Sequence, residues 1–293
     1  MDQAEQLRNI IKANNIKQKT QKPAARVIAV TSGKGGVGKS NTAINLAIWM
    51  RKMGQKVIIL DADFGLANIE IMFGAVPKYN LYDLIYQGKS IKDIITWGPA
   101  EIGFISGGSG IAGLSNLSKD NLNYIIQNLS QLDTMADVII IDTGAGISDA
   151  VLEFLVSSGE ILLVTTPEPT SITDSYSLLK ALTRHARFSA DESKIKVVAN
   201  RVEKIEDGQA LFDKLNAVVS RYLQIPLQFL GAVPRDEKLI DAVMQQMPVS
   251  LQNPEAASSK CYEYMAGKLM NKEVQLNIKK RGMAVFFSHL IKR

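Results

Sequence analysis

The chain has 293 residues, of which 46% are apolar. This length suits one large α/β domain with an extensive core better than two small domains. The single cysteine, Cys261, excludes an internal disulfide and a paired-cysteine site for a metal or cluster, and it fits a reducing cytoplasm. No stretch has the roughly 18 consecutive apolar residues of a membrane span, and the first residues lack the pattern of a signal peptide.

The basic side chains gather at the two ends. Residues 1–26 hold six basic and two acidic side chains, and residues 275–293 hold five basic and no acidic ones. Since the whole chain has a formal net charge of +5, the intervening residues 27–274 are net −4. This distribution argues against a broadly DNA-coating protein, so we expect no specific nucleic acid, and it predicts an acidic partner or surface for the ends.

The elements predicted along the chain alternate between strands and helices. A buried strand at 26–32 is followed by a helix at 41–54 that ends at a glycine. Further apolar runs predict strands at 56–63, 101–108, 137–144, 160–167, 195–200 and 227–234, and helical spacing predicts helices at 118–132, 148–157, 171–187, 207–223, 255–272 and 275–293. This pattern is typical of a doubly wound, mostly parallel α/β sheet whose ligands lie at the carboxyl ends of the strands.

The stretch TSGKGGVGKSNTA, residues 31–43, carries the phosphate-binding signature G-x-x-x-x-G-K-[ST] between a predicted strand and a predicted helix. Its glycines let backbone N–H groups turn toward phosphate oxygens, and the helix contributes its positive end. Lys39 is expected at the β- and γ-phosphates and Ser40 at a Mg²⁺ ion. The expected nucleotide contacts of this stretch are Gly33, Lys34, Gly35, Gly36, Val37, Gly38, Lys39, Ser40 and Thr42.

Three acidic residues follow predicted strands and are candidates for the metal and the attacking water. Asp142 ends an apolar strand, as required of a side chain that orients Mg²⁺, and the glycine-containing segment after it could respond to the γ-phosphate. Asp61 and Asp63 are two residues apart and point to the same side of an extended chain. We expect Asp61 near the metal and Asp63 positioning water. The alternative is that both cap a helix beginning within 65–70.

At these residues the chain resembles the deviant Walker A ATPases of the MinD/ParA group, the SIMIBI type of P-loop NTPase. The resemblance covers about residues 25–270 and rests on KGGVGKS at 34–40, DADFGLAN at 61–68, IIIDTGAG at 139–146, TTPEPTS at 165–171, VANRV at 198–202 and GAVPRDE at 231–237. It implies slow hydrolysis of ATP in a face-to-face homodimer, with Lys34 reaching the partner's phosphates and Lys34, Lys39 and Asp63 as the catalytic residues. It also implies that Asn200, Pro234 and Arg235 face adenine, with Glu168 close to the nucleotide.

Residues 2–8, DQAEQLR, are similar to the DQAxxLR motif of the FlhG (YlxH, FleN) flagellar-number regulators, in which this segment stimulates the GTPase FlhF. A short apolar stripe of this kind is marginal as an isolated helix, so we expect it to order only in a partner's groove. A frayed tail with chance periodicity is the alternative. The residues expected to activate the partner are Asp2, Gln3, Ala4, Leu7 and Arg8.

The last residues, 273–293, form a predicted amphipathic helix, and residues 275–293 within it carry five basic side chains and no acidic one. Such a helix suits an anionic cytoplasmic membrane surface. A helix docked on the core by its phenylalanines is the alternative, and the two states could alternate between monomer and dimer. The expected membrane-contacting residues are Phe286, Phe287, Leu290 and Ile291.

The sequence therefore predicts a partner-activating segment at 1–24, an ATPase domain at 25–272 and a membrane-targeting helix at 273–293. The favoured function is an ATP-switched regulator of flagellar number or placement that moves between cytoplasm and membrane and contacts an FlhF-type GTPase and flagellar basal-body components. A MinD-like division-site or ParA-like partitioning ATPase is the main alternative. An iron–sulfur carrier would need a cysteine pair, and only Asp63 argues against a scaffold that binds ATP without hydrolysing it.

Overall fold

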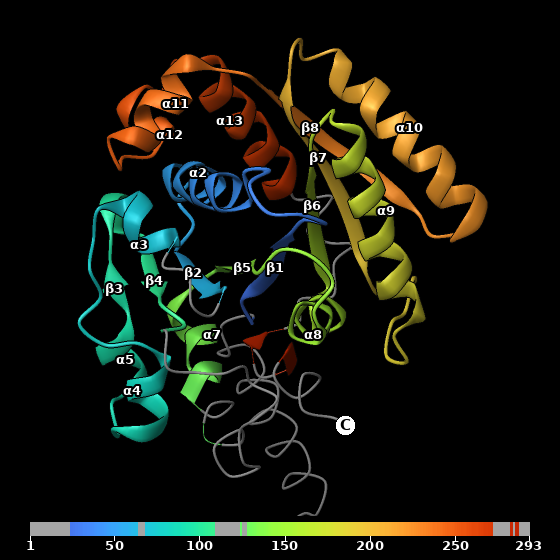
Figure 1. The fold of residues 1–293 in the computed structure, drawn as a ribbon. Coiled ribbons are helices and arrows are strands. Elements are labelled where there is room, and N and C mark those ends of the chain that lie inside the picture. Colours follow the sequence, from blue (N-terminus) through green and yellow to red (C-terminus); the bar gives the residue numbers. More distant parts are fainter. Residues whose placement is uncertain are drawn as a thin grey trace, which may run out of the picture.

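The computed structural model describes residues 24–63, 68–108, 124, 128–271, 282, 283, 285 and 286. They form an eight-stranded sheet in the order β3-β4-β2-β5-β1-β6-β7-β8 (Figure 1). Neighbouring strands are parallel except for β3, which runs antiparallel to β4. The strands are β1 (Arg26–Thr31), β2 (Val57–Ala62), β3 (Thr96–Trp97), β4 (Gly103–Ile105), β5 (Val138–Thr143), β6 (Glu160–Thr165), β7 (Lys194–Val202) and β8 (Leu227–Pro234).

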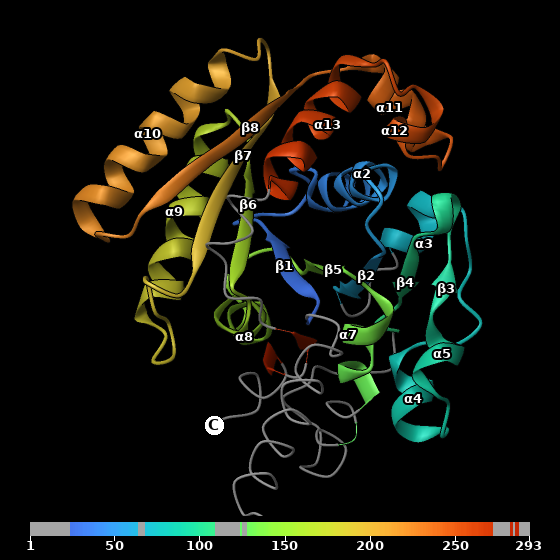
Figure 2. The ribbon, with the colours of Figure 1, turned by 180° about the vertical axis from the view of Figure 1, so that it is seen from behind.

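Helices cover both faces of this sheet. Both views show α2 and α13 lying side by side on one face, with α8 on the opposite face (Figure 1 and Figure 2). The helices of the described residues are α2 (Lys39–Lys52), α3 (Asn68–Phe73), α4 (Leu81–Tyr86), α5 (Ile91–Ile94), the 3-10 turn η1 (Pro99–Glu101), α7 (Leu132–Met135), α8 (Asp149–Ser157), α9 (Pro169–Arg184), α10 (Asp207–Tyr222), α11 (Glu237–Met244), α12 (Val249–Gln252) and α13 (Ala257–Met270).

The central strands are buried along their whole length, as their unbroken apolar runs predict. All residues of β1, β2, β5 and β6 are buried. Alternate residues of β1 enter different clusters: Ile28 and Val30 pack with α2 and α13, whereas Val27 and Ala29 face the other helical layer. Two covered faces leave no polar side to a strand, which explains why these runs do not alternate with polar residues.

The predicted α/β class and the mostly parallel sheet are confirmed. All seven predicted strands are present, and the helices predicted near 148–157, 171–187, 207–223 and 255–272 correspond to α8, α9, α10 and α13. The helix start considered within 65–70 corresponds to α3, whereas α4, α5, η1, α11, α12 and β3 were not predicted as elements of their own. The N-terminal segment 1–23 lies outside the described residues, and within them no helix is long and apolar enough to cross a membrane.

Three charged side chains form a buried cluster at the amino ends of the central strands. The guanidinium of Arg26 in β1 donates to both carboxylate oxygens of Glu160 in β6. Lys196 of β7 donates to Glu160 Oε2 over 2.5 Å. Arg26 also donates to the carbonyl oxygen of Leu269 in α13. Burial opposes the charge on Glu160, yet the two cations outweigh burial and lower its pKa. The cluster therefore fixes three strands and one helix relative to one another.

The described C-terminal residues dock on the core. Phe286 is 0% exposed and stacks on Phe154 of α8 with ring centroids 5.9 Å apart. The backbone N–H of Met283, also buried, donates to Asp133 Oδ1 over 2.8 Å. For Phe286 the structure thus shows the docked arrangement rather than a membrane-facing one. Phe287, Leu290 and Ile291 lie outside the described residues.

Replacing Glu160 by Gln should destabilise the protein by about 3–5 kcal/mol, because two buried cations would lose their counter-ion. Urea unfolding at neutral pH measures the change. Since folding lowers the pKa of Glu160, its contribution is present above the unfolded pKa and is lost as the pH falls through the folded value. The stabilities of wild type and Glu160→Gln should therefore converge in acid. Equal stabilities at pH 7 would contradict this role for the cluster.

Candidate functional site

The predicted site residues converge at the carboxyl edge of the sheet. The phosphate loop follows β1, and Asp61 at the end of β2 lies directly opposite Asp142 at the end of β5 in the strand register. Glu168 follows β6, and Asn200 lies near the end of β7. Parallel strands place their carboxyl ends at one edge, so loops distant in sequence meet there.

The loop adopts a conformation that glycine alone accommodates at key points. Gly36 and Gly38 have φ angles of +77° and +97°, in the left-handed region. Gly38 ends the loop as the N-cap of α2. A Cβ on Gly33 would lie 2.2 Å from the backbone carbon of Asp174, and one on Gly38 would lie 2.3 Å from the side chain of Asn200. The loop is therefore tightly fitted to its neighbours at both ends, while Gly35 and Gly36 face open space.

Lys39 and two carboxylates occupy the floor of the site. All three side chains are buried: Lys39 is 8% exposed, Asp61 2% and Asp142 0%. Burial raises the pKa of Asp61 to about 8, and the charge of Asp142 adds to the increase. Burial also raises the pKa of Asp142 to about 6, although the Lys39 ammonium and the nearby Ser40 hydroxyl favour its charged form. Asp142 and Lys39 can therefore balance each other's charge, whereas the raised pKa keeps Asp61 mostly protonated at neutral pH without a further cation.

The residues present fit a magnesium ion carried in with phosphate. Neither oxygen of Asp142 has a hydrogen-bond partner among the residues that the structure describes. In the same part of the chain, no group of three or more His, Cys, Asp or Glu side chains could hold a metal by itself. Mg²⁺ commonly binds through one or two protein groups plus phosphate oxygens and water. Ser40, Asp142 and Asp61 are placed for that arrangement.

Asp63 lies beside the segment after β5 that is expected to respond to the γ-phosphate. Its Oδ2 accepts a hydrogen bond from Asn68 Nδ2 over 3.3 Å, at the start of α3. A Cβ built on Gly144, after β5, would lie 3.4 Å from Asp63 Oδ1. The capping alternative describes part of the role of Asp61, whose Oδ2 accepts from the Ile69 N–H at 3.4 Å. The contact of Asp63 with α3 among the described residues is the side-chain hydrogen bond from Asn68.

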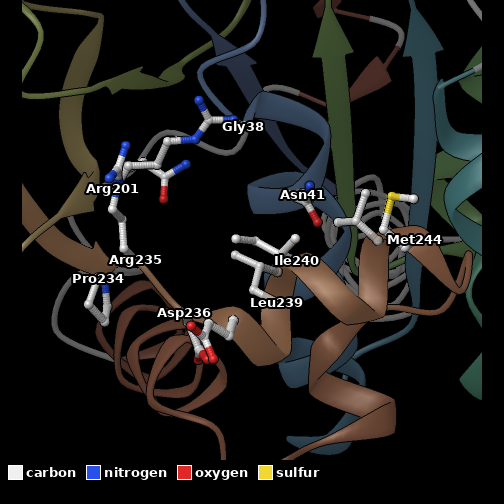
Figure 3. Close-up of a pocket in the computed structure, with 12 residues that line it drawn as sticks. Gly38, Asn41, Arg201, Pro234, Arg235, Asp236, Leu239, Ile240 and Met244 are labelled. Carbon is white, nitrogen blue, oxygen red and sulfur yellow. The ribbon is translucent and has the colours of Figure 1, made fainter.

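A cleft of about 720 Å³ opens beside the loop between β7, β8 and α11. Arg201 and Arg235 stand on one side, opposite Asn41, Leu239 and Ile240 (Figure 3). Asn200 and Pro234 also line it, as expected of residues that face a base. An apolar slot with a few polar groups is typical of a pocket for a planar ligand.

Asn200 is oriented by a contact with the loop. Its Nδ2 donates to the carbonyl oxygen of Val37 over 2.7 Å. Because a carbonyl can only accept, the amide nitrogen must face the loop, which leaves Oδ1 as the free acceptor. This oxygen is buried and unpaired within the described part of the chain. Adenine carries an amino group at its 6-position, where guanine carries the acceptor O6, so an acceptor directed at this position of the base favours adenine.

Comparison with known proteins agrees with this geometry. Residues 28–249 match the CobQ/CobB/MinD/ParA nucleotide binding domain. The chain belongs to the MinD/ParA family. Members of this family are ATPases, and the chain accordingly is an ATP hydrolase with a nucleotide-binding domain.

Relatives in the MinD/ParA family match almost the whole chain. The chain is 37% identical over 272 residues to "Antiactivator FleN" of Pseudomonas aeruginosa, covering 93% of this chain and 95% of the relative. It is 32% identical over 296 residues to "Flagellum site-determining protein YlxH" of Helicobacter pylori, covering 99% and 98%. The structure of MinD complexed with Mg-ADP from Pyrococcus horikoshii OT3 has a TM-score of 0.66 at 21% identity, covering 87% of this chain and 99% of that chain, and so shows the same fold.

Three predicted MinD/ParA site residues have neighbours that the sequence did not indicate. Lys34 contacts Glu168 of its own chain, with Nζ 2.5 Å from Oε2. Thr42 is buried, and its hydroxyl donates to the carbonyl of Gly38 over 2.9 Å, so it supports the first turn of α2. Arg235 is 69% exposed and faces Glu203 at 3.7 Å.

Several residues that line the cleft were not predicted from the sequence as site residues. A usable signal was present for α11, because Asp236 precedes an amphipathic run and its side chain caps the helix by accepting from the Lys238 N–H over 3.0 Å. Arg201 lies within the VANRV stretch, but the sequence did not indicate its φ of +57° at an irregularity in the β7–β8 pairing. The missed lining residues are Asn41, Arg201, Asp236, Glu237, Leu239, Ile240, Val243 and Met244.

Replacing Asn200 by Leu should weaken ATP binding about tenfold and narrow the preference for ATP over GTP, because the acceptor and the Val37 contact are both lost. Titration of fluorescent ATP and GTP analogues measures both affinities. Asn216→Leu, at a half-buried position of α10 that does not line the cleft, is the matched control and should bind as wild type does. An unchanged ATP/GTP ratio in Asn200→Leu would remove this side chain from base recognition.

Proposed function

We propose that this protein is an ATP-switched regulator of flagellar number or placement. The observation that carries the proposal is the pair of nearly full-length matches to FleN and YlxH, both proteins of the flagellar system by name or family, on a chain whose nucleotide site is intact. Partitioning of DNA is less well supported, since residues 27–274 are net negative. The proposed parts are a partner-activating segment at 1–24, an ATPase domain at 25–272 and a membrane-targeting helix at 273–293.

Hydrolysis in this proposal depends on positioning. The glycine loop and the amino end of α2 hold the phosphates, and Lys39 binds the β- and γ-phosphate oxygens. A bound Mg²⁺ neutralises phosphate charge, with Ser40 and Asp142 as the protein groups that hold it. Asp63, at the end of β2 beside Gly144, orients the attacking water and accepts its proton. The segments that contain Asp63 and Gly144 would close around the γ-phosphate and complete this arrangement only with ATP.

Dimerisation would bring a second lysine, Lys34 of the other copy, to the phosphates. Within the described residues, the floor of the site contains one buried lysine, Lys39, against the carboxylates of Asp61 and Asp142. Lys34 lies at the exposed mouth of the loop and can supply a second positive charge to the phosphates of a second copy. A charge provided in trans stabilises the transition state of phosphoryl transfer, as an arginine finger does. Hydrolysis would then be slow in the monomer.

Membrane binding is proposed for the C-terminal helix in its undocked state. The basic and apolar side chains of 273–293 favour an anionic surface, and the cytoplasmic face of the membrane carries such lipids. Phe286 packs against Phe154 in the docked state, so release from the core would expose an aromatic anchor. Two anchors on one dimer increase membrane affinity through effective concentration. ATP would thereby move the protein from cytoplasm to membrane.

The N-terminal segment is proposed to contact an FlhF-type GTPase, with flagellar basal-body components as further partners. Residues 2–8 carry the DQAEQLR stretch, whose apolar positions have helical spacing. A short segment of this kind gains its order from the partner's groove. The ATPase cycle would control where this segment is presented.

Asp63→Ala should bind ATP with nearly wild-type affinity, because the side chain lies beyond the phosphate loop, but its turnover should fall by at least about 100-fold. Phosphate release measures turnover, and a fluorescent analogue measures binding. Asp174→Ala, a carboxylate in the middle of α9, is the control. Turnover of Asp63→Ala at the wild-type rate would exclude its proposed role.

The double variant Leu290→Glu, Ile291→Glu should lose ATP-dependent sedimentation with anionic liposomes, since two acidic groups oppose both apolar insertion and attraction to the lipid. These positions leave the buried Met283 and Phe286 in place, so the thermal midpoint should stay unchanged. Val218→Glu, on an exposed position of α10, should sediment as wild type does. Undiminished sedimentation of the double variant would contradict the membrane assignment.

Deletion of residues 2–11 should leave ATP hydrolysis intact while abolishing stimulation of the partner GTPase, because the segment precedes the first strand of the sheet. GTP turnover of a purified FlhF-type protein, with and without the deletion variant, measures the effect. Asn14→Ala with Asn15→Ala tests the same tail outside the motif and should stimulate fully. Stimulation by the deletion variant would place the partner contact elsewhere.

A further inference from the structure

Lys34 is held within its own chain by two side chains at the beginning of α9. Its Nζ donates to Glu168 Oε2 over 2.5 Å and to Thr170 Oγ1 over 3.0 Å. Glu168 is the N-cap residue of α9, and Thr170 lies in the first turn, after Pro169. The ammonium of Lys34 holds the pKa of the Glu168 carboxyl below its ordinary value. We call the Lys34–Glu168–Thr170 arrangement the cis contact.

Lys34 lies between a glycine that packs tightly on α9 and two glycines that have open space around them. Gly33 packs so closely on α9 that a Cβ would lie 2.2 Å from the backbone of Asp174 and 2.5 Å from that of Ser175. Around Gly35 and Gly36, by contrast, the described residues other than their immediate chain neighbours place no atom within 4 Å of a built Cβ. The loop can therefore change its path after Lys34 without losing its anchor on α9.

The backbone of Lys34 is also connected to the segment after β5. Ser32 Oγ donates to the carbonyl oxygen of Lys34 over 2.7 Å. The carbonyl oxygen of Ser32 in turn accepts from the Gly146 N–H over 3.0 Å. Gly146 has a φ of +85° and lies in the segment that follows Asp142. A change in this segment on nucleotide binding would reach Lys34 through two hydrogen bonds.

We propose that Thr170 is a positioning residue, which together with Glu168 holds Lys34 in the single copy and must release it before Lys34 reaches the phosphates of a second copy. This rests on the proposed function, since it requires an ATP-dependent dimer. The Glu168 carboxylate and a phosphate compete for the same ammonium, because a lysine offers one compact charge. Glu168 therefore acts on Lys34 within its own chain and sets how readily the dimer forms.

The size of the effect follows from the exposure of the contact. Lys34 is 31% exposed and Glu168 52%, so the pair is screened by solvent. Interactions of this kind shift an equilibrium by about two- to fivefold. The Glu168 contact remains in Thr170→Val, so the hydroxyl accounts for the low end of this range, about twofold in each copy, and its removal should tighten the dimer of two copies by about four- to fivefold.

The test compares Thr170→Val with Thr173→Val, the same change at an exposed position whose hydroxyl donates to Pro169 O rather than to Lys34. Acetylation of Lys34 in the ADP state, followed by mass spectrometry and referred to the exposed Lys180, reports the cis contact directly. Analytical ultracentrifugation with a non-hydrolysable ATP analogue reports the dimer. Titration with ADP checks nucleotide binding by the monomer.

In Thr170→Val we expect acetylation of Lys34 to accelerate about twofold and the dimer to tighten about four- to fivefold, with unchanged ADP affinity. Thr173→Val should behave as wild type in all three measurements. Unchanged acetylation of Lys34, or a dimer that is no tighter than wild type, would overturn the proposal. The failure of wild type itself to dimerise with the analogue would contradict the proposed function, and the acetylation result separates the two failures.

Discussion

Two buried carboxyl groups meet one buried lysine at the carboxyl edge of the sheet, and the rest of the site depends on how their charges are balanced. The strand register sets Asp61 directly opposite Asp142, and burial raises the pKa of each. Lys39 supplies the compensating charge from the loop side. Because its pKa is raised to about 8, Asp61 is mostly protonated at neutral pH, and a Mg²⁺ ion that arrives with the nucleotide would favour its charged form. Binding of the magnesium–nucleotide complex is therefore coupled to the arrangement of the segments that follow β2 and β5.

The fold divides recognition among elements that are far apart in sequence. The ion cluster of Arg26, Glu160 and Lys196 fixes the amino ends of β1, β6 and β7, and the carboxyl ends of the same strands carry the phosphate loop, the start of α9 and Asn200. Rigid strands thus present adaptable loops, which is the usual division of labour in α/β nucleotide sites. In the proposed cycle, only the loops and the docked C-terminal residues change.

The sheet and the phosphate loop could be predicted because their signals are local. Unbroken β-branched runs predicted the buried strands, and the spacing of glycines and lysines predicted the loop. Capping boxes formed by Asn80 with Asp83 and by Ser90 with Asp93 offered equally local signals for α4 and α5 but went unused. The orientation of Asn200 could not be predicted, since it depends on a carbonyl 163 positions away. The Lys34 contacts likewise join residues 134 and 136 positions apart.

In the proposed cycle, a bound triphosphate joins two copies of the chain into a dimer. Light scattering coupled to size-exclusion chromatography, with Mg²⁺ and either ATP or ADP, measures the mass directly against the 32.1 kDa of a single chain. With ATP, a hydrolysis-deficient variant such as Asp63→Ala should have a mass near twice that value. With ADP, it should have the mass of a single chain. The same mass with both nucleotides, at concentrations that saturate the site, would contradict the proposed cycle.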